Sequence, residues 1–110
     1  MAFTTLETRP GLRAEQRARL RMMSPGRIFA PAGYGAMLRR AGFVAVTERD
    51  ITPAFSTTLA AWIAAYRRHR AGLVRVSGAA ATAGGLRWYE DRLLAVQQRL
   101  IRRMLYVAER

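Results

Sequence analysis

Residues 31–53, PAGYGAMLRRAGFVAVTERDITP, decide how the chain folds. The first half of this stretch opens with a proline, which fits the first turn of a helix, and continues with apolar residues at the helical spacings i, i+3, i+4 and i+7. These apolar residues are Tyr34, Met37, Leu38 and Ala41. The spacing predicts a helix over 31–41 that ends at Gly42. Glycine adopts the left-handed conformation of a Schellman motif, in which Phe43 would fold back on Leu38.

The second half of the stretch predicts a strand followed by a new helix. Residues 43–48, FVAVTE, are short, β-branched and aromatic, and they are apolar on both faces, as in a sheet that is covered on both sides. Thr52-Pro53 then has the pattern of a helix N-cap with proline at the first helical position.

Most of the remaining chain is predicted to be helical. Helices are expected over 12–23, 53–74 and 86–103, and the last two carry apolar stripes that would bury against each other. The stripes are Leu59, Trp62, Ile63, Tyr66 and Leu73 on one helix and Leu86, Tyr89, Leu93, Val96 and Leu100 on the other.

Three segments fall outside these helices. Residues 104–108, MLYVA, predict a closing strand that pairs antiparallel with 43–48. Residues 77–85, SGAAATAGG, have the small side chains of a loop, and residues 1–11 are expected to be irregular, with a turn at Pro10-Gly11.

Composition narrows the possible functions. The 110 residues fit one small domain, and the net charge of +12 comes from 19 arginines without a single lysine, beside 20 alanines. That pattern is typical of a GC-rich gene, although the charge still favours anionic partners. The absence of cysteine excludes disulfides and thiolate chemistry, and the single histidine, His69, argues against a zinc site. Without a span of about 20 apolar residues or a signal-peptide pattern, we expect a cytoplasmic protein.

The order of the predicted elements resembles a known family. A helix ending in Ala41-Gly42-Phe43, a Val-rich strand, Asp50-x-Thr52, a helical pair and the closing Leu105-Tyr106-Val107-Ala108 follow one another. This order is similar to the C-terminal third of class I S-adenosylmethionine-dependent methyltransferases of the small-molecule type. The resemblance covers nearly the whole chain, and it makes Ala2-Phe3-Thr4 similar to the exit from the family's fifth strand.

The resemblance implies an α/β fold, namely the C-terminal fragment of a Rossmann-like methyltransferase, mostly helical with two short antiparallel strands. The chain would be a single partial domain. Its parts would be helices over 1–42, a strand over 43–48, a helical insertion over 53–103 that roofs the substrate pocket, and a closing strand over 104–109.

The cofactor-binding motif of that family is missing from this sequence. The family holds its cofactor with a glycine-rich loop after the first strand and an acidic residue after the second. The nearest glycine pair, Gly33-x-Gly35, has Leu38 where a third glycine would fall. We therefore interpret the chain as a truncated gene, a product with a misassigned start, or one piece of a split protein. S-adenosylmethionine would serve the intact family, but the chain alone is not expected to bind it, and it should self-associate or need its missing N-terminal half.

Four residues are candidates for lining a substrate pocket: Tyr34, Trp62, Tyr66 and His69. Each has a structural alternative, because aromatic residues on apolar stripes usually pack in a core and His69 lies in an arginine-rich helix face. Asp50 and Thr52 would either touch substrate or cap the following helix. No catalytic residue and no metal ligand is assigned.

Two other classes of function stay open. Arginines on the two long helices could form a face that follows a phosphate backbone, making the chain a nucleic-acid-binding module. Alternatively, the helical pair could bind a membrane surface or a partner protein. A steep dependence of DNA binding on salt concentration would separate the first class from the rest.

Overall fold

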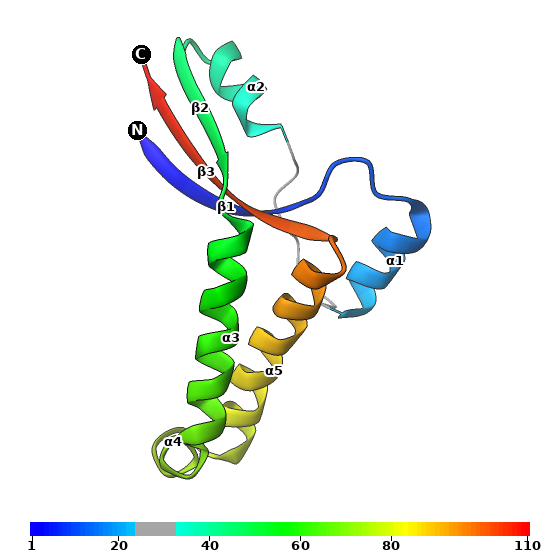
Figure 1. Cartoon of the computed structure of the whole chain (residues 1–110), viewed down its shortest axis with the longest axis vertical. Helices are drawn as coiled ribbons and strands as arrows, with labels where there is room; N and C mark the ends of the chain where they lie inside the picture. Colours follow the sequence, from blue (N-terminus) through cyan, green and yellow to red (C-terminus); the bar gives the residue numbers. More distant parts are fainter. Residues whose placement is uncertain (24–32) are drawn as a thin grey trace.

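A three-stranded antiparallel sheet and a long helical hairpin make up the protein (Figure 1). The structure, a computed structural model, describes residues 1–23 and 33–110. The hairpin projects from one end of the sheet, and the molecule is elongated, with extents of 50 × 32 × 22 Å. This architecture is a mixed α/β fold, as the sequence predicts.

The sheet contains β1 (Ala2–Thr8), β2 (Ala45–Asp50) and β3 (Ile101–Glu109) in the order β1-β3-β2. Because β3 lies between the other two strands and is antiparallel to both, β1 and β2 run parallel to each other. The predicted antiparallel pairing of the segments 43–48 and 104–108 is confirmed. The strands differ slightly from their predicted bounds, since β2 begins two residues later and β3 three residues earlier.

The expectation that residues 1–11 are irregular is wrong for β1. The segment Ala2–Thr8 contains Phe3, Leu6 and three threonines, which favour strands. Its sequence pattern does not reveal a strand because the fully buried position is taken by Glu7, a charged residue that is rarely found inside a protein.

The helix that precedes β2 has the predicted C-terminus. α1 (Ala14–Met23) is followed, within the described part of the chain, by α2 (Tyr34–Arg40). The Phe43 N–H donates to the Leu38 carbonyl and the Gly42 N–H to the Arg39 carbonyl, both at 3.1 Å, and Gly42 has φ +98°. These are the two hydrogen bonds of a Schellman motif. The predicted start of this helix at residue 31 lies outside the described residues.

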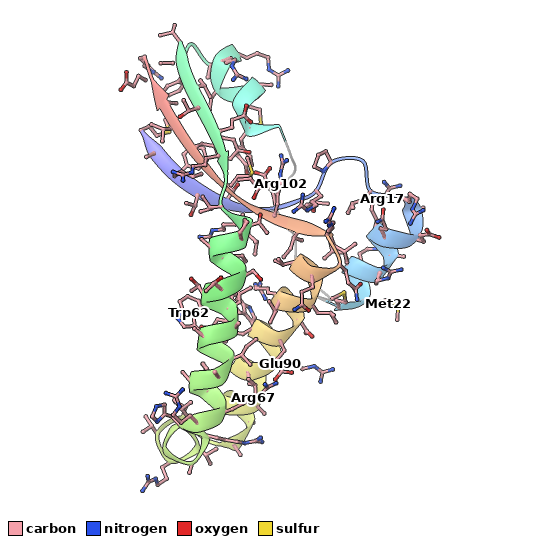
Figure 2. The ribbon with its side chains drawn as sticks, viewed as in Figure 1. Arg17, Met22, Trp62, Arg67, Glu90 and Arg102 are labelled. Atoms are coloured by element: carbon pink, nitrogen blue, oxygen red, sulfur yellow. The ribbon has the colours of Figure 1, made fainter. Side chains whose placement is uncertain are left out.

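The hairpin consists of α3 (Thr52–Arg68), the short α4 (Arg70–Ser77) and α5 (Ala79–Gln97). α3 packs along α5, which confirms the predicted helical pair, and an ion pair between Arg67 and Glu90 at 3.4 Å links the two helices (Figure 2). The predicted helix 53–74 is divided at His69, which separates α3 from α4.

The loop predicted over 77–85 is wrong. Only Gly78, with φ +89°, separates α4 from α5, and the alanines that follow it begin α5 because alanine has the highest helix propensity. The predicted helix 86–103 is also too long. It ends at Gln97, where Arg99 takes a left-handed conformation with φ +57°, and the chain turns into β3.

The hydrophobic core lies where the hairpin meets the sheet and α1. Its buried members are Leu20, Leu59, Ala95, Val96, Leu100 and Ile101. The core therefore holds the start of the hairpin next to the end of β1 and the beginning of β3, whereas the far end of the hairpin extends beyond the sheet (Figure 1).

Candidate functional site

The carboxyl ends of the parallel strands β1 and β2 lie at the same edge of the sheet. Thr8, the last residue of β1, pairs with Ile101, and Asp50, the last residue of β2, pairs with Met104. In open α/β sheets, ligands bind outside the carboxyl ends of the strands. Two pockets flank this edge.

The first pocket, which we call the tryptophan pocket, lies between the sheet and the hairpin and has a volume of about 460 Å³. Both tryptophans of the chain line it, Trp62 from α3 and Trp88 from α5. The full lining is Leu6, Ile51, Ala54, Phe55, Thr58, Trp62, Trp88 and Arg103. Its size and apolar walls are typical of a small-molecule site.

The aromatic walls of the tryptophan pocket are held by neighbouring side chains. The Trp62 ring lies 5.2 Å from the Tyr89 ring, edge to face, although 48% of the Trp62 surface stays exposed. The buried Arg92 places its guanidinium carbon 3.2 Å from the centre of the Trp88 ring. Such contacts fix the orientation of both indoles.

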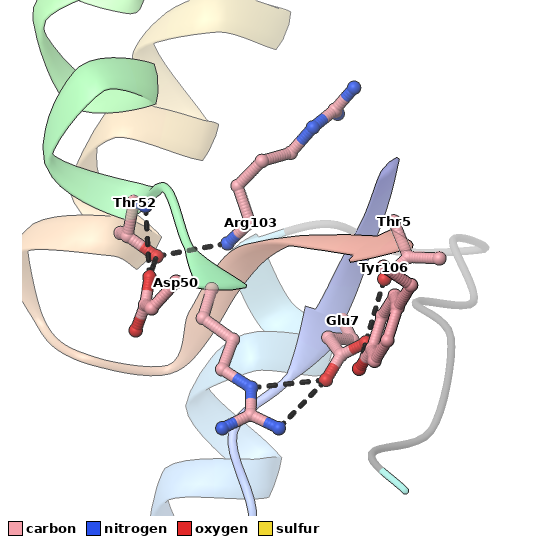
Figure 3. A network of polar contacts seen from close by, with 7 residues as sticks. Thr5, Glu7, Asp50, Thr52, Arg103 and Tyr106 are labelled. Atoms are coloured by element: carbon pink, nitrogen blue, oxygen red, sulfur yellow. Dashed lines mark hydrogen bonds and ion pairs between the residues drawn. The ribbon is translucent and has the colours of Figure 1, made fainter. Parts of the chain in front are cut away.

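Arg103 is the charged residue of the tryptophan pocket. Its guanidinium lies 5.2 Å from the centre of the Phe55 ring and donates from Nη2 to the Thr4 hydroxyl at 2.8 Å. Its backbone N–H donates to the Thr52 hydroxyl, so the beginning of β3 and the start of α3 are tied together (Figure 3). The pocket thus combines an aromatic surface with a positioned cation.

The second pocket, the strand-end pocket, has a volume of about 490 Å³ and is more polar. It is lined by Arg9, Asp50, Thr52, Pro53, Ser56, Val96 and Gln97. The Asp50 carboxylate accepts hydrogen bonds from the N–H and the hydroxyl of Thr52 (Figure 3). Burial acts to raise the pKa of Asp50, but these hydrogen bonds and the charges of Arg9 and Arg102 outweigh it and hold the pKa below its usual value.

A buried polar network crosses the sheet beside these pockets (Figure 3). Glu7 is fully buried and accepts hydrogen bonds from Arg102 Nε and Nη2 at 3.0 and 2.9 Å, from the Tyr106 hydroxyl at 2.8 Å and from the Thr5 hydroxyl at 2.6 Å. Burial, together with the hydrogen bond to Glu7 and its charge, raises the pKa of Tyr106 to about 12. Every oxygen of this carboxylate is engaged, so we regard the network as structural.

The structure does not bring the four predicted pocket residues together. Trp62 and Tyr66 share contacts with Tyr89 of α5, at 5.2 and 5.4 Å between ring centres, as expected for residues that pack the two helices. Tyr34 belongs to a different cluster on the sheet, 5.6 Å from the ring of Tyr106. His69 lies at the junction of α3 and α4, at the end of the hairpin away from the sheet (Figure 1). Of the four, only Trp62 lines the tryptophan pocket.

Asp50 and Thr52 take the capping arrangement, which is one of the two interpretations of their sequence pattern. The Asp50 carboxylate accepts the N–H of Thr52, the first residue of α3, at 2.9 Å, while Ile51 occupies the N-cap position. Helix boundaries assigned from sequence commonly differ by one residue. Both side chains also line the strand-end pocket, so the cap forms part of the wall of that pocket.

Three pocket residues are not among those predicted from the sequence: Phe55, Trp88 and Arg103. Trp88 lies one position before the predicted stripe residue Tyr89, and Arg103 was placed inside a helix that ends six residues earlier. A signal existed for the tryptophan, since tryptophan is enriched at binding surfaces and Trp88 lies outside the predicted apolar stripe. No sequence signal distinguishes Arg103 among the 19 arginines.

The glycine pair Gly33-x-Gly35 has a structural role. Gly33, with φ +101°, caps α2, and Gly35 is buried where α2 crosses β2. A Cβ on Gly35 would lie 2.4 Å from the Glu48 carboxyl group. Gly35 therefore permits close packing of helix on strand, and Gly33 supplies the left-handed residue before the helix.

Comparison with solved structures places the fold. The chain superimposes on phosphoethanolamine N-methyltransferase 2 of Haemonchus contortus, solved in complex with phosphomonomethylethanolamine and S-adenosylhomocysteine, with a TM-score of 0.80 and 12% sequence identity. The match covers 97% of this chain and 25% of that enzyme, so the chain has the fold of a quarter of a methyltransferase. No protein-family model matches the sequence, and no curated protein does.

Two further observations concern residues 1–23 and 33–110. Their helices are too short or too polar for any of them to cross a bilayer. Their histidine, aspartate and glutamate side chains form no group of three or more that could hold a metal ion.

Proposed function

We propose that the chain is the substrate-side, C-terminal part of an S-adenosylmethionine-dependent methyltransferase that acts on a small molecule. The observation that carries this proposal is the topology. An antiparallel β3 lies between the parallel strands β1 and β2, a helical hairpin joins β2 to β3, and this arrangement matches a methyltransferase over 97% of the chain.

The cofactor site would be supplied by another part of the sheet. The Haemonchus enzyme, whose complex contains S-adenosylhomocysteine, is four times as long as the segment that this chain matches. Cofactor binding in this fold class depends on the amides of a glycine-rich loop and an acidic residue on the ribose. In this chain Gly35 instead lies against Glu48, where α2 packs on β2, which supports the assignment of the cofactor site to another part of the sheet.

The edge of β1 is where the cofactor-binding part would join. Neither outer strand has a second partner among the described residues, but the two edges differ in charge. β2 carries Glu48, Arg49 and Asp50, and charged edge strands resist further pairing. β1 reads AFTTLET, and its single charged side chain, Glu7, is turned inward and buried. The uncharged edge of β1 therefore favours the addition of another strand.

The substrate would lie against the tryptophan pocket, which opens at the carboxyl edge of the strands. In this role Trp62 and Trp88 contact the methyl acceptor, while Tyr66 supports Trp62 through their shared neighbour Tyr89. Tyr34 would not contact the substrate but would support the sheet by packing on Tyr106.

Calorimetry and fusion test the proposal together. The isolated chain should show no micromolar affinity for S-adenosylmethionine, and fusing it to a cofactor-binding N-terminal portion of a matched methyltransferase should create cofactor binding that S-adenosylhomocysteine competes. In the fusion, Trp62→Ala should change acceptor use more than cofactor affinity. Micromolar binding of the cofactor by the isolated chain would contradict the proposal, as would a folded fusion that never binds it.

A salt titration separates this function from nucleic-acid binding. The charge of +12 gives any polyanion a non-specific attraction that weakens steeply with salt. We expect DNA binding to vanish near physiological salt and to show no sequence preference. Tight, sequence-dependent DNA binding under those conditions would overturn the methyltransferase proposal.

A further inference from the structure

The walls of the tryptophan pocket favour a flat, apolar ligand. Phe55 and Trp62 project from α3, Trp88 projects from α5, and Leu6 closes the side formed by β1. Trp62 keeps 48% of its surface exposed even though it is fixed against Tyr89. A planar ligand that covers this indole would remove apolar surface from water, which favours binding.

The polar side of the same pocket favours an anion. Arg103 donates one N–H to the neutral Thr4 hydroxyl, and within the described residues its guanidinium has no carboxylate partner. The neighbouring Arg102 differs, because its guanidinium is paired with the buried Glu7. Arginine offers five N–H donors in a planar fork that matches a carboxylate.

The ring under Arg103 holds the guanidinium at the pocket wall. The guanidinium carbon lies 5.2 Å from the centre of the Phe55 ring, and Thr4 fixes the Nη2 end. Two contacts from two different elements thus position one cation beside two indoles. A ligand with a negative group close to an aromatic body would meet both features at once.

We propose that the tryptophan pocket binds a small aromatic carboxylic acid, with its ring against Trp62 and Trp88 and its carboxylate paired with Arg103. The binding is a property of this chain alone. Its meaning, that such an acid is the methyl acceptor or its close analogue, rests on the proposed function. The pocket differs in kind from a site for the phosphomonomethylethanolamine named with the Haemonchus enzyme, since that molecule has no aromatic body.

Ligand-observed fluorine NMR on the full chain tests the proposal. The probes are 4-fluorophenylacetate, its neutral isostere 4-fluorophenylacetamide, and phosphoethanolamine as an unlabelled competitor. We expect the acid to bind more tightly than the amide and phosphoethanolamine to leave the acid bound. Because both tryptophans of the chain line the pocket, the acid should also change the tryptophan fluorescence with the same affinity.

Three variants locate the site. Arg103→Gln should weaken binding of the acid by about tenfold and leave binding of the amide unchanged, as expected when one charge-assisted contact is lost. Arg103→Lys keeps the charge but loses the planar fork of the guanidinium. Its affinity for the acid should lie between those of the wild type and Arg103→Gln. Arg68→Gln removes the same charge from an exposed position on α3 and should change neither affinity. Far-UV circular dichroism confirms that each variant folds.

The outcomes are distinct. Equal binding of acid and amide, an equal effect of Arg68→Gln and Arg103→Gln, displacement by phosphoethanolamine, or no binding of either probe at millimolar concentration would each overturn this proposal. Failure here together with cofactor binding by the fusion would leave the proposed function intact. Binding of the acid without cofactor binding by the fusion would support the ligand proposed for the pocket and contradict the proposed function.

Discussion

The hydroxyl of Tyr66 lies 2.8 Å from the position that a Cβ on Gly85 would occupy. Tyr66 belongs to α3 and Gly85 to α5. The two helices of the hairpin approach closely here because Gly85 has no side chain. The contact also explains why a helix keeps a glycine in its interior, where glycine ordinarily costs about 1 kcal/mol relative to alanine. Packing of the tyrosine thus outweighs helix propensity at residue 85.

The adjacent glycines 84 and 85 should respond in opposite ways to alanine. Nothing lies within 4 Å of a Cβ on Gly84, so Gly84→Ala should raise the free energy of unfolding by roughly 0.5–1 kcal/mol. Gly85→Ala must displace the Tyr66 ring, and we expect it to lower the free energy of unfolding by about 1 kcal/mol. Chemical denaturation of both variants measures the difference. Equal stabilisation by the two substitutions would show that Tyr66 moves at no cost.

Two residues in the left-handed region give a second matched pair. Arg99, with φ +57°, closes α5 with the same hydrogen bonds that Gly42, with φ +98°, makes after α2. Arg99→Gly should stabilise the protein by about 0.5–1 kcal/mol, and Gly42→Ala should destabilise it by about 1 kcal/mol, since a Cβ in this conformation is strained. Thermal unfolding reports both. A fall in melting temperature for Arg99→Gly would mean that the arginine side chain makes a stabilising contact that exceeds the backbone strain.

These examples show which parts of the fold can be predicted from sequence. The cap at Gly42 and the stripes of α3 and α5 depend on residues a few positions apart, so local patterns reveal them. β1 is hidden because Glu7 occupies its most buried position, and the charge is acceptable only because Arg102, 95 residues away, meets it. The tryptophan pocket collects residues from β1, α3, α5 and β3, and no local pattern brings Leu6 and Arg103 together.

The buried hydroxyl of Tyr106 predicts an alkaline transition. Its pKa is raised from 10.0 to about 12 in the folded protein, so the folded state holds this proton more tightly than the unfolded state. The corresponding stability, roughly 2–3 kcal/mol, is fully present below pH 10 and is lost as the pH rises toward 12.

Tyr106→Phe isolates this effect. At neutral pH the substitution removes one donor from the buried Glu7 and should cost about 1–3 kcal/mol. Between pH 10 and 12 the variant should lose less stability than the wild type, so the two unfolding curves should converge. Parallel curves over this range would show that Tyr106 titrates as it does in the unfolded chain.

The Asp50 carboxylate predicts a loss of stability at acidic pH. Its pKa in the folded protein lies below its ordinary value of 3.8, so its contribution to stability is present above that pH and is lost as the pH falls through the folded pKa. Asp50→Asn keeps an oxygen that can accept the Thr52 N–H but removes the charge that Arg9 and Arg102 stabilise. The variant should be less stable than the wild type at pH 7 and equally stable at strongly acidic pH. A difference that persists in acid would assign the effect to the cap geometry alone.

The outer edge of β1 should control self-association. The Arg9 N–H donates to the Leu100 carbonyl and the Ala108 N–H to the Met1 carbonyl. The odd-numbered residues of β1 therefore direct their backbone N–H and C=O groups toward β3. The even-numbered residues, Thr4 among them, direct their N–H groups away from the sheet. A strand with unpaired N–H and C=O groups and no exposed charge pairs readily with another chain, and we expect concentration-dependent association in sedimentation velocity.

Proline substitutions at neighbouring positions of β1 separate the two sides of the strand. Thr4→Pro removes an outward N–H, so the chain should stay folded while its self-association falls, because proline is tolerated on edge strands only where the N–H is free. Thr5→Pro removes an inward N–H and should destabilise the sheet itself. Thr4→Ala controls for the loss of the hydroxyl that accepts from Arg103 and should associate as the wild type does. If Thr4→Pro associates as strongly as Thr4→Ala, the contact surface lies elsewhere, and the proposed junction with the cofactor-binding part at β1 is wrong.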